Sequence, residues 1–418
     1  MTGFRQYFLS ILFSFLTLST QGRPPVLIEK CAPPMRPTSL WLRIPESKVY
    51  QMSYAAVPLI ISGVIVQSAD DRFRDMRNNY LPRVRFHTDD YLQYAPAALM
   101  LGLKAAGLPG RSSWGRMLVS DAFSTGIMAI TINSLKYTCR VMRPDGSSRN
   151  SFPSGHTATA FMTATMLHKE YGLTHSPWYS IGGYAVATLT GLMRIANNKH
   201  YLSDVMVGAG VGILSAELGY WLADLIFTKR GMVSPEHMEP PFSVAYRPSF
   251  FGLYLGIDAL PGVYRLQDHS QIRFSIGSCI GVEGAWFWNA HWGAGGRLRL
   301  SSLPWTLNGH VSDNNFNAIH GAVGLYGSLP ITSRWLVGTK LLCEYTYSLP
   351  VEFAGHTLGS CNAIGAGTGL SLTFRAHTGM GLKFFTDYTL SSSPVQKQCG
   401  GCHTLSLGGV ISVLFGPN

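Results

Sequence analysis

The chain has 418 residues, with 33 Lys and Arg against 22 Asp and Glu and a formal net charge of +11. Hydrophobic residues make up 46% of the chain and charged residues only 13%, well below the roughly 25% charge of ordinary soluble globular chains, which favours a membrane-associated protein. The length predicts two or three domains, and the chain has no Lys/Arg run with interleaved aromatics of the kind that would favour a nucleic-acid partner.

The positive charge is concentrated in the first part of the chain. Residues 249–418 contain 9 Lys and Arg against 7 Asp and Glu, which leaves 24 against 15 in the residues before them. A basic surface of this kind attracts the phosphate groups of lipids. We therefore expect an anionic phospholipid or a lipopolysaccharide as the partner of the first part, and no nucleic acid.

The amino terminus has the layout of a signal peptide. Arg5 precedes an apolar run over residues 7–16, and small residues follow up to Gly22. The run is too short for a membrane anchor, because a span needs roughly 20 residues. We predict a signal peptide at residues 1–22 and, because the next segment is rich in Pro, an extended lead-in at residues 23–47.

Residues 48–227 carry helical signals. Six apolar segments are expected to form six helices, near 54–67, 92–106, 117–135, 154–168, 181–196 and 205–227. None of them offers 18 apolar residues free of charge or strong polarity, as Asp121 and Glu217 illustrate. This favours a compact bundle with a polar interior, and six separate lipid spans are the alternative.

Residues 228–248 contain several Pro residues and form a predicted linker. After it the hydrophobic period changes from 3.6 to 2, and eight alternating segments begin near 249, 271, 290, 317, 332, 362, 377 and 403. The alternate face consists mainly of Gly, Ser and Thr with few charges, so the large apolar face is expected to contact lipid. Residues 249–418 resemble bacterial outer-membrane barrels and predict an eight-stranded antiparallel β-barrel. A periplasmic sandwich is the alternative.

The residues with the clearest chemistry lie between 136 and 204. They form three short motifs: Lys136-x6-Arg143-Pro144, Pro153-Ser154-Gly155-His156 and Arg194-x5-His200-x3-Asp204. Cations stabilise the charge that develops on a transferred phosphoryl group. A Ser-Gly helix start can point backbone amides at a phosphate. The i, i+4 spacing places the last imidazole and carboxylate on one helix face, where the carboxylate can fix the tautomer of the imidazole.

These three motifs, in this order, resemble the signature of the type 2 phosphatidic acid phosphatase superfamily, which also contains bacterial acid phosphatases and vanadium haloperoxidases. The resemblance covers about residues 48–227. It departs from the family at Met193, where the family pattern has Ser.

The resemblance implies a role for each residue of the motifs. His200 would be the nucleophile that forms a phosphohistidine, Asp204 its orienting partner and His156 the general acid. The phosphate would be bound by the remaining residues of the signature, namely Lys136, Arg143, Ser154, Gly155 and Arg194. The family chemistry requires no metal and no cofactor.

Other interpretations of the same residues are weaker. A metal site made of His156, His200 and Asp204 is disfavoured because three adjacent cations would repel the ion. A serine hydrolase centred on Ser154 lacks the Gly-x-Ser-x-Gly elbow. Taken singly, the cations would be solvated surface charges, and His200 with Asp204 would be a structural hydrogen bond.

The chain has seven Cys, which an exported protein can use for disulfides, with one left over. Cys399-Gly400-Gly401-Cys402-His403 also fits the attachment pattern of c-type haem. A short disulfide-closed loop or two free thiols is the simpler interpretation, because a lone five-residue match is weak evidence.

Taken together, the sequence predicts a two-domain α plus all-β protein, an exported phosphatase of lipid phosphates with a helical catalytic domain and a barrel anchor. Substrates of the family that fit a location in the cell envelope are phosphatidic acid, phosphatidylglycerophosphate, undecaprenyl pyrophosphate and the phosphates of lipid A. We expect an outer-membrane barrel with a periplasmic catalytic domain, and a multi-pass inner-membrane protein is the alternative. Three other functions stay open: a non-specific periplasmic acid phosphatase, a vanadate-dependent haloperoxidase, and a porin or adhesin with an inactive helical domain.

Overall fold

The computed structural model describes residues 48–81, 87–228, 230–234, 247–265, 270–312, 314–332, 334–353, 356–377, 380–392 and 401–414. The predicted signal peptide (1–22) and lead-in (23–47), Cys399 and most of the predicted linker (228–248) lie outside the described residues. The described cysteines, Cys139, Cys279, Cys343, Cys361 and Cys402, are free thiols.

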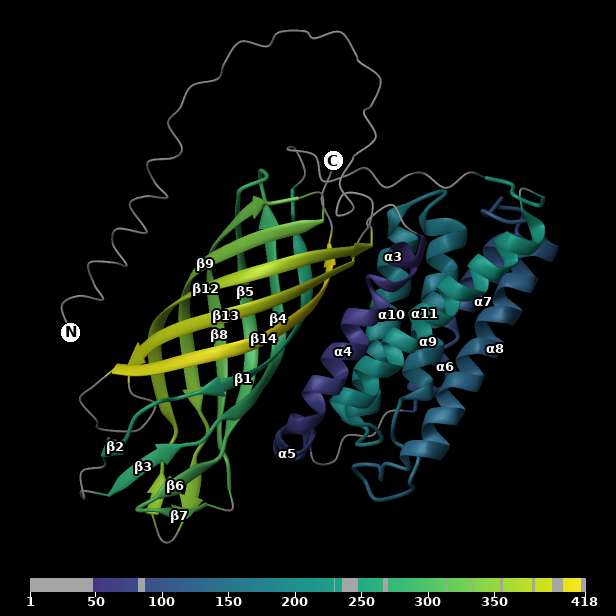
Figure 1. The fold of residues 1–418 in the computed structure, drawn as a ribbon. Helices are drawn as coiled ribbons and strands as arrows, with labels where there is room; N and C mark the ends of the chain where they lie inside the picture. Colours follow the sequence, from purple (N-terminus) through teal and green to yellow (C-terminus); the bar gives the residue numbers. More distant parts are fainter. Residues whose placement is uncertain are drawn as a thin grey trace, which may run out of the picture. The chain divides into compact units, whose positions relative to one another are not determined.

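The helical part contains nine α-helices among the described residues (Figure 1). They are α3 (Lys48–Ser53), α4 (Ala56–Val66), α5 (Asp70–Tyr80), α6 (Asp89–Leu92), α7 (Ala95–Ala105), α8 (Trp114–Cys139), α9 (Gly155–Leu167), α10 (Pro177–Ala196) and α11 (Leu202–Phe227). A 3-10 turn, η2 (Gln67–Ala69), and a π-helical turn, η3 (His168–Gly172), complete the set.

Seven of these helices have eleven residues or more, so the expectation of six helices was wrong. The additional helix is α5, whose sequence DDRFRDMRNNY is strongly polar. Only Phe73 and Met76 give it an apolar face, at i, i+3, and both are buried. Asp70 and Asp71 in its first turn and Arg77 in its last turn complement the helix dipole. These charges are a helix signal that does not depend on apolar residues.

Helix α11 forms the core of the helical part. It packs against α4, α8 and α9, and small residues let these helices approach closely. A Cβ built on Gly212 would lie 2.2 Å from the backbone oxygen of Ala158 in α9. Two described helices, α8 and α11, are long and apolar enough to cross a membrane by length and composition, but 72% of the α11 window is buried against 17% of the α8 window.

The second part is a closed eight-stranded barrel, which confirms the predicted architecture and excludes the two-sheet sandwich. Each strand pairs antiparallel with its neighbours, and β1 pairs with β14 to close the ring. The strands are β1 (Phe250–Ala259), β4 (Gly277–Phe287), β5 (Trp292–Leu303), β8 (Phe316–Pro330), β9 (Trp335–Ser348), β12 (Cys361–His377), β13 (Met380–Ser392) and β14 (Gly401–Leu414).

The predicted strand start near 271 falls on a short strand outside the barrel. That strand, β3 (Gln271–Phe274), belongs to a small sheet with β2 (Tyr264–Arg265), β6 (Trp305–Leu307) and β7 (His310–Val311). The barrel strand itself begins at Gly277. Figure 1 shows this small sheet extending from one end of the barrel.

The two ends of the barrel differ in the length of their connections. Short turns join β4 to β5, β8 to β9 and β12 to β13, whereas the connections at the other end are longer and carry the small sheet and the pair β10 (Val351–Phe353) and β11 (His356–Leu358). Phe250 pairs with Leu414, so the first and last barrel strands enter and leave at the short-turn end.

The barrel is apolar outside and polar inside. Exposed aliphatic side chains cover the outer face, for example Leu298, Val323 and Leu341. The expectation of few charges on the other face was wrong, because many charged side chains are buried in the lumen, among them Asp258, Glu283, Arg297, Arg299, Lys340, Glu344, Lys383 and Asp387. These eight residues come from five strands, β1, β4, β5, β9 and β13, and each strand contributes only one or two, so no single strand has a charged sequence.

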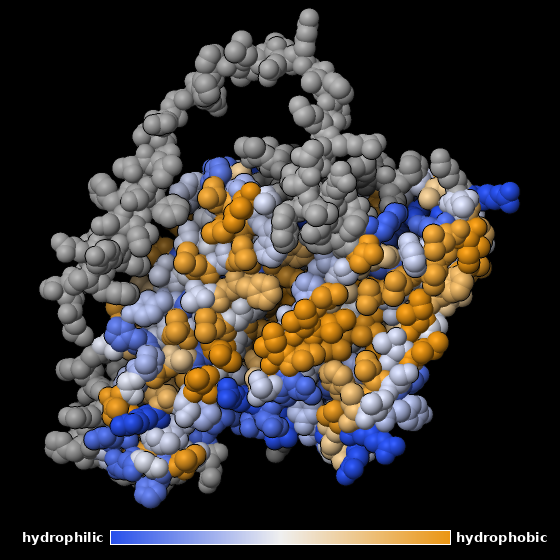
Figure 2. All heavy atoms as spheres, viewed as in Figure 1, coloured by the Kyte–Doolittle hydropathy of each residue, from blue (hydrophilic) through white to orange (hydrophobic). Residues whose placement is uncertain are grey.

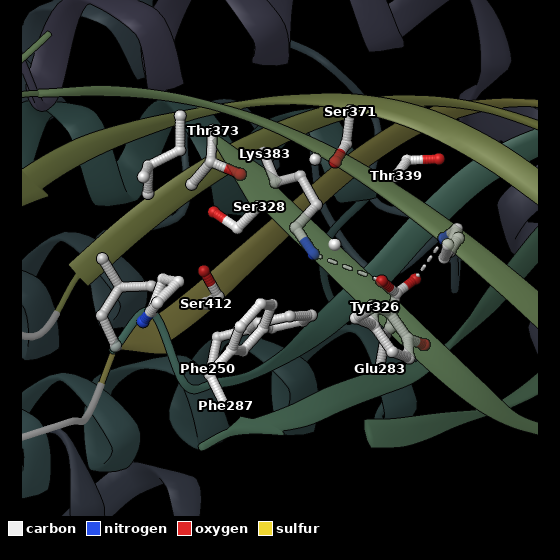
Figure 3. Close-up of a pocket in the computed structure, with 16 residues that line it drawn as sticks. Phe250, Glu283, Phe287, Tyr326, Ser328, Thr339, Ser371, Thr373, Lys383 and Ser412 are labelled. Atoms are coloured by element: carbon white, nitrogen blue, oxygen red, sulfur yellow. Dashed lines mark hydrogen bonds and ion pairs between the residues drawn. The ribbon is translucent and has the colours of Figure 1, made fainter. Parts of the chain in front are cut away.

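Every charge in this lumen set is paired. Arg297 contacts Asp387 at 2.5 Å and Glu344 at 2.8 Å, and Lys340 lies 2.9 Å from Glu283. Figure 3 shows the cavity near the short-turn end, where Lys383 reaches Glu283 at 3.3 Å among Ser and Thr hydroxyls. The cavity of about 30 Å³ has room for only one or two water molecules, so this part of the lumen is filled rather than open.

Candidate active site

The last signature motif places His200 immediately before α11 and Asp204 in its first turn. Nδ1 of His200 lies 3.5 Å from Oδ2 of Asp204, and both side chains are buried. The same carboxylate oxygen accepts hydrogen bonds from the backbone amide of Tyr201 at 2.9 Å and from the hydroxyl of Ser151. Asp204 is therefore fixed by several contacts, and its position next to Nδ1 leaves Nε2 of His200 as the nitrogen available for chemistry.

Burial lowers the pKa of His200 to about 4. The carboxylate of Asp204 opposes this shift, and the charges of Arg194 and Lys136 add to it. A neutral imidazole carries the lone pair that a nucleophile needs. His200 is therefore neutral at neutral pH, as its predicted role as a nucleophile requires.

The second motif forms the start of α9. Ser154 is the N-cap, with its Oγ 2.9 Å from Oγ1 of Thr157, and Gly155 is the first helical residue. The backbone amide of Ser154 donates to the backbone oxygen of Asp204 at 3.0 Å, which joins the starts of α9 and α11. A Cβ built on Gly208 would lie 2.6 Å from the backbone oxygen of Ser154, so this approach requires glycine.

The three cations come from three different elements. Lys136 lies in the last turn of α8 and donates to the backbone oxygen of Asn150 at 2.6 Å. Arg143 lies in the loop that follows, and Arg194 lies in the last turn of α10. A Cβ built on Gly155 would lie 3.9 Å from Cε of Lys136, so the lysine stem borders the start of α9.

The two arginines carry donors that have no acceptor. Nε of Arg143 and Nε of Arg194 are both buried and have no hydrogen-bond partner among the described residues. Burial, followed by the charge of Arg194, lowers the pKa of Arg143. The guanidinium groups are thus close enough to repel each other, and an anion between them would supply the missing acceptors and relieve that repulsion.

The structure adds two carboxylates that the sequence analysis missed. Asp89 is 1% exposed and accepts from Nη1 of Arg194 at 2.6 Å and from Nδ2 of Asn197 at 3.1 Å. Asp90 accepts from Nε2 of His156 at 2.9 Å and lies 3.6 Å from Nη1 of Arg194. The only sequence signal for them is an Asp-Asp pair at the start of a short helix, α6, far from the three motifs.

His156 lies in the first turn of α9 and is half-buried. Burial and then the charge of Arg194 lower the pKa of His156, and the hydrogen bond to Asp90 opposes the shift. The charge of Arg194 thus favours the neutral imidazole, and the carboxylate of Asp90 favours the protonated one. Such a balance suits a group that must release a proton during a reaction.

The fold thus gathers the predicted residues around the starts of α9 and α11. His200 and Asp204 are in contact, Ser154 and Gly155 open α9, and the cations interact electrostatically with His200 or with one another. The catalytic and phosphate-binding roles of these residues stay predictions. Within the described residues, no group of three or more His, Cys, Asp or Glu has the arrangement of a metal site.

Comparison with known proteins gives the family of this region. Residues 117–226 match the PAP2 superfamily. A lipid A 1-phosphatase of Porphyromonas gingivalis is 49% identical over 175 residues, which are 41% of this chain and 39% of the relative. The chain therefore aligns with about two fifths of that relative's length.

Two solved structures are each similar to part of the chain. A transmembrane PAP2-type phosphatidylglycerolphosphate phosphatase of Bacillus subtilis is 20% identical, covers 43% of this chain and 97% of its own length, and has a TM-score of 0.31. Neisserial surface protein A is 11% identical, covers 40% of this chain and 97% of its own length, and has a TM-score of 0.28. The family match and the motifs agree, and residues 117–226 of this chain are a PAP2 superfamily domain.

Proposed function

We propose that this protein is a cell-envelope phosphatase that hydrolyses a phosphomonoester of a lipid, with lipid A as the first candidate substrate. The observation that carries the proposal is the buried His200–Asp204 pair beside two arginines whose buried Nε donors have no acceptor within the described part of the chain. The name of the 49% identical relative, a lipid A 1-phosphatase, supports the choice of substrate.

The proposed reaction has two steps. Nε2 of His200 attacks phosphorus, the bond from phosphorus to the lipid oxygen breaks, and His156 gives its proton to that oxygen. A water molecule then attacks the phosphohistidine while His156 takes a proton from it, which releases inorganic phosphate and restores both imidazoles. Lys136, Arg143, Arg194 and the free amides at the start of α9 stabilise the charge on the transferred group.

The surface of α8 supports a lipid substrate. Ile130 is 71% exposed and Tyr137 is 76% exposed, and the latter is the direct neighbour of Lys136. Exposed Trp114 begins the same helix, about 35 Å away at 1.5 Å per residue, which is close to the roughly 30 Å of a bilayer core. Figure 2 shows broad apolar areas over the helical part. Acyl chains lying along this face would bring their headgroup to the end of α8 that carries Lys136.

Features of the barrel support an outer-membrane address. The outer face is apolar, with exposed Trp286, Trp288 and Trp292 near the short-turn end and exposed Tyr345 and Tyr388 near the other end. Outer-membrane barrels have aromatic girdles of this kind, with short turns on the periplasmic side. Because β1 begins at the short-turn end, the catalytic part that precedes it would lie in the periplasm.

A substrate panel tests the proposal. Purified full-length protein is incubated in mixed micelles with lipid A, with phosphatidylglycerophosphate and with a soluble sugar phosphate, and phosphate release is measured. We expect lipid A to be hydrolysed at least about tenfold faster, by kcat/KM, than the soluble ester, and mass spectrometry of the product to show loss of one phosphate. Comparable rates on all three would instead favour the non-specific acid phosphatase.

His200→Ala provides the inactive control for the panel. It should abolish phosphate release while leaving the barrel folded, since the replaced side chain belongs to the helical part. Activity retained by this variant would refute the phosphohistidine mechanism. Halide oxidation by the wild-type protein with added vanadate would favour the haloperoxidase, and recovery with the inner membrane on fractionation would refute the outer-membrane address.

A further inference from the structure

Two adjacent carboxylates, Asp89 and Asp90, contact two different groups of the candidate site. Asp89 is buried and holds Arg194 at 2.6 Å, whereas Asp90, whose side chain is 55% exposed, lies 2.9 Å from His156 and reaches Arg194 only at 3.6 Å. Since the hydrogen-bonded partners of the two carboxylates differ, the two residues differ in what their loss would change.

We infer that Asp90 is the positioning residue for the general acid, and that it holds the imidazole of His156 with Nε2–H on its carboxylate and Nδ1 directed to the leaving lipid oxygen. This rests on the proposed function. Beyond that function, we assign the two adjacent carboxylates to different steps. Asp89 acts on phosphate binding through Arg194, and Asp90 acts on proton transfer through His156.

The hydrogen bond fixes which nitrogen does the chemistry. A carboxylate accepts only, so the 2.9 Å contact requires a proton on Nε2 of His156. In the imidazolium, Nδ1 carries the second proton, which passes to the leaving oxygen. In the neutral ring that results, Nε2–H stays on Asp90 and Nδ1 carries the lone pair that takes a proton from the attacking water. One orientation of the ring thus serves both steps.

The electrostatics give Asp90 a second effect. The charged groups that act on His156 are Arg194, which favours loss of the proton, and Asp90 and Asp89, which favour its retention. The carboxylate of Asp90 offsets both burial and the guanidinium. Without its charge, His156 would lose its proton at a lower pH and the fraction of enzyme with a competent acid would fall.

The nature of the leaving group tests this division. A lipid alkoxide is a strong base that needs a proton to depart, whereas 4-nitrophenolate is a stable anion that departs without one. Four variants are compared with the wild type on lipid A and on 4-nitrophenyl phosphate: Asp90→Asn, Asp89→Asn, His156→Ala and, as a matched control, Asp71→Asn, whose side chain is 79% exposed.

We expect Asp90→Asn to lower kcat/KM about 10- to 100-fold on lipid A and less than about threefold on the aryl ester. His156→Ala should show the same selectivity with a larger loss, about 100-fold or more, as for removal of a general acid. Asp89→Asn should reduce both activities to a similar extent, because both esters need the phosphate held, and Asp71→Asn should reduce neither.

The pH profile is the second readout. In Asp90→Asn the alkaline limb of kcat/KM on lipid A should move to lower pH, because loss of the carboxylate lowers the pKa of His156. Equal losses on both esters, or an unshifted alkaline limb, would overturn the inference. If the protein does not hydrolyse the aryl ester, the position of the alkaline limb of kcat/KM on lipid A tests the inference by itself. Failure of the wild-type protein to release phosphate from any ester would refute the proposed function instead.

Discussion

Nη1 of Arg194 lies 2.6 Å from Oδ2 of Asp89, and both side chains are buried, 105 residues apart in the chain. The ion pair holds the guanidinium in place without using all its donors, since Nε of Arg194 has no acceptor among the described residues. The arginine proposed to bind phosphate is thus held in position by the fold itself, and the desolvation cost of its charge is offset by the carboxylate.

Asp89→Ala should therefore destabilise the helical part. It leaves the buried Arg194 with only its 3.6 Å contact to the exposed Asp90, and removing one partner of a buried ion pair typically costs about 3–5 kcal/mol. The double variant Asp89→Leu with Arg194→Met should recover much of this free energy of unfolding, yet stay inactive. Thermal unfolding in detergent together with phosphate release measures both. A single variant as stable as the wild type would contradict the role of the pair.

Asp204→Asn should impair catalysis without removing any atom of the nucleophile. The amide cannot fix the imidazole of His200 with a proton on Nδ1 and cannot stabilise its cationic form, and loss of such a carboxylate lowers kcat by about 10⁴-fold in a comparable His–Asp arrangement. Ser151→Ala, which removes one hydrogen bond to the same carboxylate, should cost much less. Comparable losses in the two variants would show that Asp204 acts only through local packing.

The dependence of kcat/KM on pH should be bell-shaped with an acidic optimum. His200 must be neutral, so activity appears above its pKa of about 4. His156 must be protonated to act as the acid, and burial lowers the pKa of His156 below the usual 6.5. Activity should therefore fall as the pH rises through a value below 6.5. The profile is measured with correction for the substrate phosphate, whose second pKa is about 6. His156→Ala should lose the alkaline limb, and a wild-type optimum above neutrality would contradict the assignment.

Gly208→Ala should separate the starts of α9 and α11. A Cβ there would lie 2.6 Å from the backbone oxygen of Ser154, so the helices must move and the amides at the start of α9 are displaced. We expect a stability loss of about 1–3 kcal/mol and reduced kcat/KM. Gly126→Ala in α8 is the matched control, because a Cβ there meets nothing within 4 Å. If both variants keep full activity, the close approach does not position the site.

Glu283→Gln should destabilise the barrel but not the catalytic site. Glu283 lies 2.9 Å from Nζ of Lys340 and 3.3 Å from Nζ of Lys383, and all three side chains are buried. Removing one partner of a buried ion pair costs about 3–5 kcal/mol. Urea unfolding in lipid vesicles, followed by tryptophan fluorescence, should show a lower midpoint. Phosphate release measured before unfolding should equal that of the wild type, and an unchanged midpoint would show that the lumen pairs contribute no stability.

Local sequence was sufficient for the barrel and for most of the site. The strand period of 2 fixed which side chains of 249–418 face outward, since that alternation is a property of each strand alone. The i, i+4 spacing of His200 and Asp204 pointed to their contact, but the predicted common helix face was wrong, because His200 lies before the start of α11 and only Asp204 is helical. The closed eight-stranded barrel confirms the first of these predictions, and the PAP2 match of residues 117–226 agrees with the motifs.

Only the tertiary structure determined the contacts between residues that are far apart in the chain. Asp89 meets Arg194 and Asp90 meets His156 only because α6 is brought beside α9 and α10. Arg297 meets Asp387 across 90 residues only because the barrel closes. A short-range period carries no information about which distant charge will neutralise a buried one. The motifs therefore gave the candidate catalytic groups, and only the fold gave the carboxylates that contact them.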